Sequence, residues 1–183
     1  MNIARQKSKR IGLRRLPFGS LKPETRQGYT LVCVALWSTI AFLFIHRFVV
    51  SAVVVDGRSM MPTLSPGNRC LVNSWLPYFR EYKRGDLVVV RDHARGEMMV
   101  KRIIGLPRDR VQFLNGKVLV NSQCLKEPYV PKGAYTYSRQ LGSREIKVAA
   151  NAYFVMGDNR LYSEDSRAYG DVDRGDIVGL ISQ

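Results

Sequence analysis

The order of apolar and polar positions divides this 183-residue chain into three zones. Residues 1–28 are polar and basic, and glycine and proline interrupt them repeatedly. None of the sixteen residues from Thr30 to Ile45 is charged. After residue 48 the apolar residues fall into short runs separated by Gly, Pro, Asn and Asp, which is the pattern of strands joined by turns.

The uncharged run is short for a membrane span, because a spanning helix needs roughly 17–25 residues. A cleaved signal peptide is one alternative, but residues 50–52 are a poor cleavage site. A buried core helix is another, but the run lacks the polar face that such a helix normally shows. We therefore predict a single transmembrane helix over residues 29–47.

The charge that precedes this span predicts its orientation. Residues 1–29 hold eight Lys or Arg against one acid, Glu24, and so account for half of the formal net charge of +14. A basic arm can bind nucleic acid or anionic lipid, but basic residues beside a span favour its cytoplasmic side. The prediction is a cytoplasmic tail at residues 1–28 and an extracytoplasmic domain at residues 48–183 of an inner- or plasma-membrane protein.

The third zone is predicted to be mainly β, a folded-over antiparallel sheet or barrel-like domain. Asn115-Gly116 is a strong hairpin signal, and no long stretch has the period of an amphipathic helix. Residues 126–147 are interpreted as a loose insertion, and the aromatic residues 75–79 either touch the membrane surface or pack on the domain. The predicted strands are residues 48–55, 69–73, 87–90, 98–104, 111–114, 117–120, 152–156 and 177–181.

Two residues in apolar surroundings could carry chemistry. Ser59 follows the first strand in a turn that contains Gly57 and Pro62. Lys101 lies among core-like residues of another strand, between Val100 and Ile103 in an apolar run. Burial lowers the pKa of a lysine, and a neutral amine can take a proton from a serine hydroxyl.

The two histidines are weaker candidates for a catalytic base. His46 lies at the edge of the predicted span, and His93 lies in a polar turn. Neither is expected to have an apolar setting or a neighbouring acid that orients it. A Ser-His-Asp triad is therefore not predicted, and no spacing of His, Cys or carboxylates suggests a metal site.

Three motifs follow the predicted span in a fixed order. They are Gly57-x-Ser59-Met60-x-Pro62-Thr63-Leu64, Lys101-Arg102-Ile103-Ile104-Gly105-Leu106-Pro107-x-Asp109 and Gly157-Asp158-Asn159-x-x-x-Ser163-x-Asp165-Ser166-Arg167. Together they resemble the motifs of the type I signal peptidase (leader peptidase) family, which are membrane-bound serine endopeptidases with a Ser-Lys dyad. The resemblance covers most of the chain after the span and implies a mostly β catalytic domain.

The resemblance implies that Ser59 is the nucleophile and Lys101 the general base. The implied supporting residues are Ser163, which would orient the lysine amine, the pair Asp158 and Arg102, and the pair Asp165 and Arg167.

The resemblance also implies a shallow substrate pocket and an oxyanion hole. Met60, Leu64 and Val100 would line the pocket, and the backbone of Ser59, with Gly57 beside it, would stabilise the oxyanion. Some family members have a serine at the position of Gly57, so the backbone N–H carries more of this stabilisation here. Arg108 is a second departure, because the family motif usually has glycine there and an arginine with positive φ would be strained.

The implied activity is removal of signal peptides from secreted preproteins, with no cofactor. The implied partners are preprotein signal peptides and membrane lipids, with a secretion translocon as a further candidate and no nucleic acid. Two alternatives stay open: an organelle or dedicated maturation peptidase with few substrates, and, more distantly, a non-catalytic adaptor with a lipid-binding tail. A Cys70–Cys124 disulfide and two free thiols also both stay open.

Overall fold

The structure is a computed structural model that describes residues 23–48, 50–93, 95–138 and 142–182. The chain divides into two compact units between Leu43 and Phe44, and most of helix α1 (Pro23–Phe48) belongs to the first. Large apolar side chains of α1, such as Trp37, are exposed. Among the described residues, no helix combines the length and the apolar character needed to cross a membrane. Most of the predicted tail, residues 1–22, lies outside the described residues.

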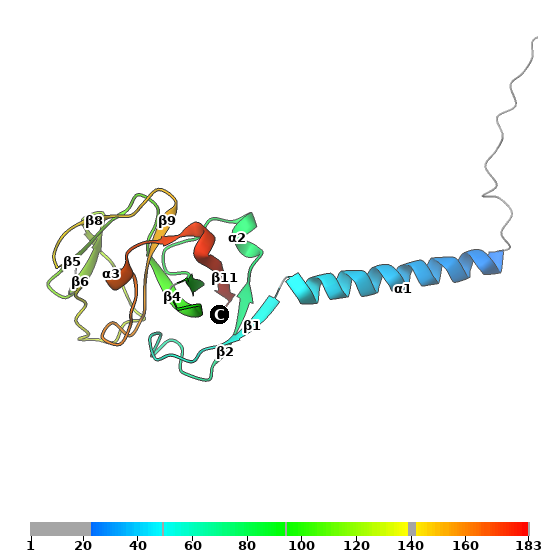
Figure 1. Cartoon of the computed structure of the whole chain (residues 1–183), viewed down its shortest axis with the longest axis horizontal. Coiled ribbons are helices and arrows are strands. Elements are labelled where there is room, and N and C mark those ends of the chain that lie inside the picture. Colours follow the sequence, from blue (N-terminus) through cyan, green and yellow to red (C-terminus); the bar gives the residue numbers. More distant parts are fainter. Residues whose placement is uncertain (1–22, 49, 94, 139–141, 183) are drawn as a thin grey trace, which may run out of the picture. The chain divides into compact units, whose positions relative to one another are not determined.

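Antiparallel strands dominate the second unit, so the mainly β fold class is confirmed. The larger sheet consists, in spatial order, of β1 (Val50–Val54), β2 (Arg69–Asn73), β11 (Ile177–Ser182), β3 (Leu87–Asp92), β4 (Glu97–Gly105), β9 (Ala152–Met156) and β10 (Val172–Asp173). The smaller sheet consists of β7 (Gln123–Cys124), β6 (Lys117–Val120), β5 (Arg110–Leu114) and β8 (Ile146–Lys147). In Figure 1 the smaller sheet and the β1–β2 pair lie at opposite ends of this unit.

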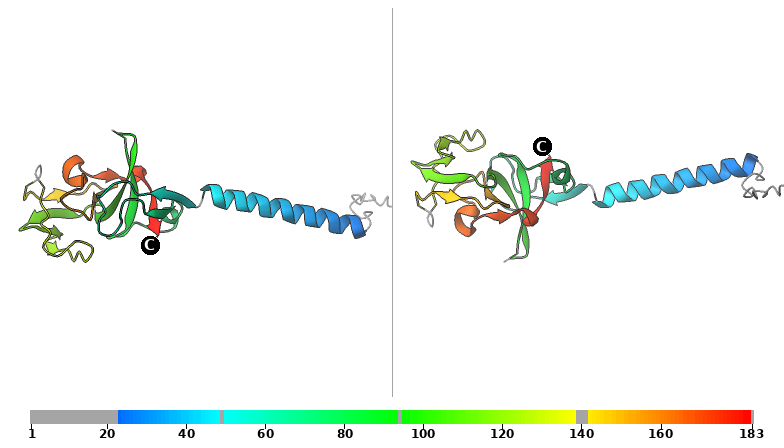
Figure 2. Two further views of the ribbon diagram at one scale, coloured as in Figure 1. Left: turned by 90° about the horizontal axis from the view of Figure 1, so that it is seen from below. Right: turned by 90° about the horizontal axis from the view of Figure 1, so that it is seen from above.

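Besides β10, which ends the sheet on its other side, two strands of the larger sheet have an open edge. β1 is an end strand that pairs with β2. β4 pairs with β3 along residues 97–102, but it pairs with β9 only from Arg102 onward. The β3–β4 hairpin extends beyond the rest of the unit in both views of Figure 2. The first half of β4 therefore has one edge that β9 does not cover.

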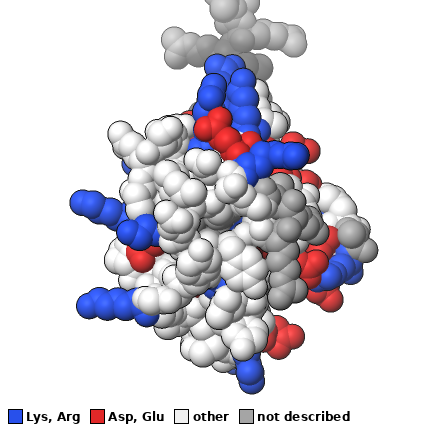
Figure 3. Space-filling view, turned by 90° about the vertical axis from the view of Figure 1, so that its left-hand side faces the viewer, with Lys and Arg blue, Asp and Glu red and all other residues white. Residues whose placement is uncertain are grey.

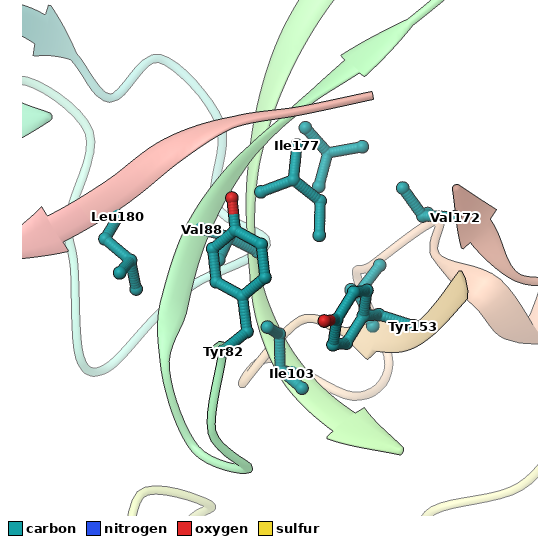
Figure 4. Packing of buried hydrophobic residues seen from close by; sticks show 9 residues of the cluster. Tyr82, Val88, Ile103, Tyr153, Val172, Ile177 and Leu180 are labelled. Atoms are coloured by element: carbon teal, nitrogen blue, oxygen red, sulfur yellow. The ribbon is translucent and has the colours of Figure 1, made fainter. Parts of the chain in front are cut away.

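The core explains why β3 is a continuous apolar run rather than an alternating one. Val88 and Val90 face one buried cluster, and Leu87 and Val89 face another. Because successive side chains of a strand point to opposite faces, a strand buried on both faces needs apolar residues throughout. Figure 4 shows the first of these clusters, in which the ring of Tyr82 lies near that of Tyr153.

Two turns depend on left-handed backbone conformations. Asn115 and Gly116 have φ values of 49° and 76°, and they join β5 to β6 as the predicted hairpin. Arg108 has a φ of 70°. A non-glycine residue in this region costs roughly 1–2 kcal/mol, so the departure from glycine noted in the sequence does place an arginine in a strained conformation.

The sequence pattern did not predict three two-residue strands, β7, β8 and β10, or the short helical segments α2 (Leu76–Phe79), α3 (Ser166–Tyr169) and η1 (Arg174–Asp176). Elements of two to four residues are too short to show a period. α2 lies in the aromatic segment, where Leu76 packs against the core while Tyr78 and Phe79 are exposed.

Charge is dispersed over the end of the unit that carries the smaller sheet (Figure 3). Most of the described surface on that face is neither basic nor acidic, and the charged side chains stand mainly around its rim. The positive charge of the chain is thus not gathered on this face.

Candidate functional site

Ser59 and Lys101 lie side by side in the second unit. Ser59 belongs to the turn that follows β1, and Lys101 lies in β4. Lys101 Nζ is 3.1 Å from Ser59 Oγ, which is hydrogen-bond distance. The structure thus brings together the two residues that the sequence analysis predicts as nucleophile and base.

Backbone hydrogen bonds hold the turn that presents Ser59. Before the serine, Val55 N–H donates to Asn68 O at 2.9 Å. After it, Leu64 N–H donates to Met60 O at 2.9 Å and closes one helical turn. The side chain of Met60 is fully buried. Because the chain is fixed on both sides, the hydroxyl of Ser59 has a rigid support.

The environment of Lys101 favours the neutral amine. Lys101 is 3% exposed. Burial lowers the pKa of its amine, because the charged form loses its hydration; the carboxylates of Asp165 and Glu164 act in the opposite direction, and Arg167 adds to the lowering. Burial is the largest of these effects. The amine therefore loses its proton more easily than an ordinary lysine, as a general base requires.

The loop of residues 157–167, which we call the 157–167 loop, is built around Asp165. The carboxylate of Asp165 is fully buried and accepts hydrogen bonds from Gly157 N–H at 3.0 Å and from Arg167 Nε at 2.8 Å. The loop also contacts the nucleophile directly, because Asn159 N–H donates to Ser59 O at 2.9 Å. The Asp165–Arg167 ion pair that the resemblance implies is present.

A second buried ion pair joins the three motifs. Arg102 Nε and Nη2 donate to the two carboxylate oxygens of Asp158 at 2.8 and 2.6 Å. Thr63, from the first motif, donates its hydroxyl to the same carboxylate. A bidentate arginine–carboxylate pair fixes both position and orientation. The pair therefore connects the Ser59 turn, β4 and the 157–167 loop.

Ser163 is close to the dyad but does not have the contact that the resemblance implies. Among the described residues, its buried hydroxyl has no hydrogen-bond partner, and the amine of Lys101 is not bonded to it. Gly157 explains how Ser163 fits here: a Cβ on Gly157 would overlap Ser163 Oγ and Ser59 O. The 157–167 loop can approach the nucleophile this closely only because residue 157 has no side chain.

A groove of about 510 Å³ leads to the dyad between the open edges of β1 and β4. One wall is formed by residues 53–57 and the other by residues 97–101, with Ser59 and Lys101 at the same end. Met60 and Val100 line the groove, whereas Leu64 packs against the same apolar cluster without lining it.

Gly57 also lines the groove. A Cβ on Gly57 would meet only the backbone nitrogen of Ser59, at 3.9 Å. A side chain at position 57 would therefore stand beside the N–H group that the resemblance assigns to the oxyanion hole, and it would fit without a collision.

Several contacts of the site were not foreseen. The sequence analysis gives no role to Thr63 or Asn159. Their positions inside the first and third motifs were the only sign in the sequence that they belong to the site. The expectation that no acid orients His93 is wrong, since His93 Nε2 lies 2.7 Å from Asp176 Oδ1. His93 and Ser59 line different cavities. Cys70 and Cys124 are free thiols.

Comparison with known proteins identifies the family of the chain. Residues 28–183 match the family described as "Signal peptidase, peptidase S26". The chain is 34% identical to signal peptidase I U of Bacillus subtilis over 84% of its own length and 85% of the relative, and 41% identical to a signal peptidase I of Bacillus amyloliquefaciens over 68% and 69%. A crystal structure of a signal peptidase I from Enterococcus faecalis matches 56% of this chain and 98% of that one, with 27% identity and a TM-score of 0.48. The chain belongs to the signal peptidase family, peptidase S26.

Proposed function

We propose that this protein removes signal peptides from secreted preproteins, with Ser59 as nucleophile and Lys101 as general base. The observation that carries the proposal is the distance of 3.1 Å between Lys101 Nζ and Ser59 Oγ, with the lysine 3% exposed. Relatives named signal peptidase I, which align with most of the chain, support the same reaction.

The reaction begins when Ser59 Oγ attacks the carbonyl carbon of the scissile bond and its proton passes to Lys101 Nζ. The C–N bond then breaks, the lysine returns the proton to the leaving nitrogen, and the signal peptide is left as an ester on Ser59. Water attacks the ester, Lys101 takes the proton of the water, and the proton returns to Ser59 Oγ. The backbone N–H of Ser59 would stabilise the oxyanion in both halves.

The two walls of the groove suit an extended substrate segment. Val55 points its backbone groups to the β2 side, where its N–H donates to Asn68 O and its C=O accepts from Gly67 N–H. Because the hydrogen-bonding direction alternates along a strand, the N–H and C=O of Val54 face the groove. In β4, Ile103 forms its backbone hydrogen bonds with residues 85 and 86, on the β3 side. By the same alternation, the N–H and C=O groups of Met98 and Val100 point to the opposite side, which is the groove. A substrate strand would bond to both edges.

The apolar floor near the dyad supports a preference for small side chains before the cut. Met60 is fully buried and Val100 is 9% exposed, and Leu64 packs against the same cluster. Met60 and Val100 line the groove beside Ser59 and would limit the depth of the pocket, while Leu64 supports them from behind. A large residue in the substrate would collide with Met60 or Val100, or be displaced from the nucleophile.

We further propose that residues 29–47 anchor the chain in a membrane, with the N-terminus in the cytoplasm. Support comes from the uncharged run between Thr30 and Ile45, its helical conformation and the basic residues before it. The exposed rings of Tyr78 and Phe79, at 84% and 78%, support contact of the aromatic segment with the lipid surface. An anchored peptidase would meet its substrates where they emerge from the bilayer.

The experiment is cleavage of a preprotein by the full-length protein purified in detergent. Ser59→Ala and Lys101→Met should each abolish cleavage, because each removes one partner of the proton transfer. Lys117→Met is the matched control: Lys117 is an exposed strand lysine of the smaller sheet, and this variant should cleave like the wild type. Cleavage by Lys101→Met would exclude the dyad.

A further inference from the structure

Polar side chains from residues 127–136 converge on Arg160, a residue of the 157–167 loop. Arg160 Nη1 donates to Glu127 Oε2 at 3.0 Å and to Thr136 Oγ1 at 2.8 Å, and Nη2 donates to Glu127 Oε1. The side chain of Arg160 is 1% exposed and that of Glu127 is 11% exposed. A buried, bidentate ion pair therefore lies in a segment that the sequence analysis interprets as a loose insertion.

We propose that Glu127 is a positioning residue for the peptidase reaction: it fixes Arg160 and, through Arg160, holds the 157–167 loop against the backbone of Ser59. This inference deepens the function proposed above and rests on it.

The first link runs from Arg160 to the nucleophile. Arg160 Nε donates to Gly157 O at 3.2 Å. Gly157 is packed against Ser59 O so closely that a Cβ would overlap it, and Asn159 N–H donates to the same Ser59 oxygen at 2.9 Å. A shift of Arg160 would therefore move the two loop residues that fix the carbonyl of the nucleophile.

The second link runs through Tyr129 to the residue next to the base. The hydroxyl of Tyr129 donates to Glu127 Oε1 at 3.2 Å, and the guanidinium of Arg102 lies over the Tyr129 ring at 3.9 Å from its centroid. Burial raises the pKa of Tyr129, so its hydroxyl stays protonated and able to donate. Arg102 follows Lys101 in β4. Glu127 thus supports both sides of the dyad.

Stability alone does not account well for this arrangement. A buried ion pair loses hydration on folding, and apolar replacements of similar volume are often equally stable. What a bidentate pair adds is a defined orientation, because the guanidinium is a rigid fork with fixed donor directions. Reaction rates are sensitive to orientation, since a displacement of ~1 Å can cost about 100-fold.

The test compares Glu127→Gln with the wild type in the detergent assay. Glu127→Gln should lower kcat by roughly 10–100-fold, with KM within about threefold, because the substrate groove is not touched. Glu127→Asp keeps the charge but is shorter, so it should retain an intermediate kcat. Glu145→Gln is the matched control: it removes the same charge from an exposed pair with Arg110, and its kcat should equal that of the wild type.

Thermal unfolding of each variant separates positioning from folding. If Glu127→Gln does not fold, Tyr129→Phe replaces it, because that variant loses only the hydroxyl bond to Glu127 and should still lower kcat. A folded Glu127→Gln or Tyr129→Phe with wild-type kcat would overturn the inference while Ser59→Ala remains inactive. A wild-type protein that cuts no preprotein would overturn the proposed function itself.

Discussion

Lys101 is a residue whose placement opposes folding. Its amine is buried at 3% exposure, and burial lowers its pKa below the ordinary value. The unfolded chain therefore holds one more proton than the folded one between the folded and unfolded pKa values of this group. Across that window the free energy of unfolding rises with pH, and below it the full cost of the buried charge is present.

Replacing the lysine should therefore stabilise the protein while it abolishes cleavage. We expect Lys101→Met to raise the free energy of unfolding by ~0.5–2 kcal/mol, as substitutions that relieve an unfavourable functional group commonly do. The gain should be largest below the folded pKa of the lysine and shrink as pH rises toward its unfolded value. Denaturant unfolding at several pH values measures it.

The control for this prediction is Lys117→Met, at an exposed position in β6. It should change the free energy of unfolding little at any pH. A Lys101→Met variant that is less stable than the wild type at every pH would show that the amine is a net stabilising group, contrary to the lowered pKa.

At the scale of elements, the open edges of β1 and the first half of β4 are where the sheet could accept a substrate strand. Val54→Pro tests whether the β1 edge binds the substrate through its backbone. The substitution removes an N–H that faces the groove and leaves the β2-facing N–H and C=O of Val55 in place. We expect kcat/KM for a preprotein to fall ~5–100-fold, the effect of leaving a buried hydrogen-bonding group unpaired.

Val54→Ala is the control for the proline, since it removes most of the exposed side chain and keeps the N–H. It should retain most of the activity. Steady-state kinetics of both variants provide the measurement. Equal losses in Val54→Ala and Val54→Pro would mean that the side chain, and not the backbone edge, binds the substrate.

The elements and contacts that the sequence predicts differ from those that it does not in how close the interacting residues lie along the chain. The strands that contain Val88 and Lys101 were predictable, because their apolar neighbours lie next to them in the chain. Residue type alone did not predict the proximity of Ser59 and Lys101, because most strand lysines are exposed to solvent; the three motifs, taken together, predicted it. The pairing of Glu127 with Arg160 was not predictable, because the partners are 33 positions apart in loops that have no period. The backbone conformation of Arg108 was predictable only in part: the motif usually has glycine at this position, which indicates a positive φ, and the structure has a φ of 70° there.

At the scale of the whole molecule, the basic N-terminal segment and the β unit have separate tasks in the proposed function. The first 29 residues carry half of the net charge, while the groove and the dyad lie entirely in the second unit. Tethering an enzyme and its substrate to one surface raises their effective concentration. The β unit should therefore lie on the side of the membrane where preproteins emerge.

The native cysteines offer a test of that orientation. Cys124 is exposed in β7, Cys70 is buried at 7% exposure, and Cys33 lies in the segment proposed to be covered by lipid. A membrane-impermeant maleimide added to protoplasts should therefore label the wild-type protein, and Cys124→Ser should remove most of the label. Cys70→Ser, the matched control, should be labelled like the wild type. Labelling of Cys124 that required permeabilised membranes would place the β unit in the cytoplasm and contradict the proposed topology, because the dyad lies in the same unit as Cys124.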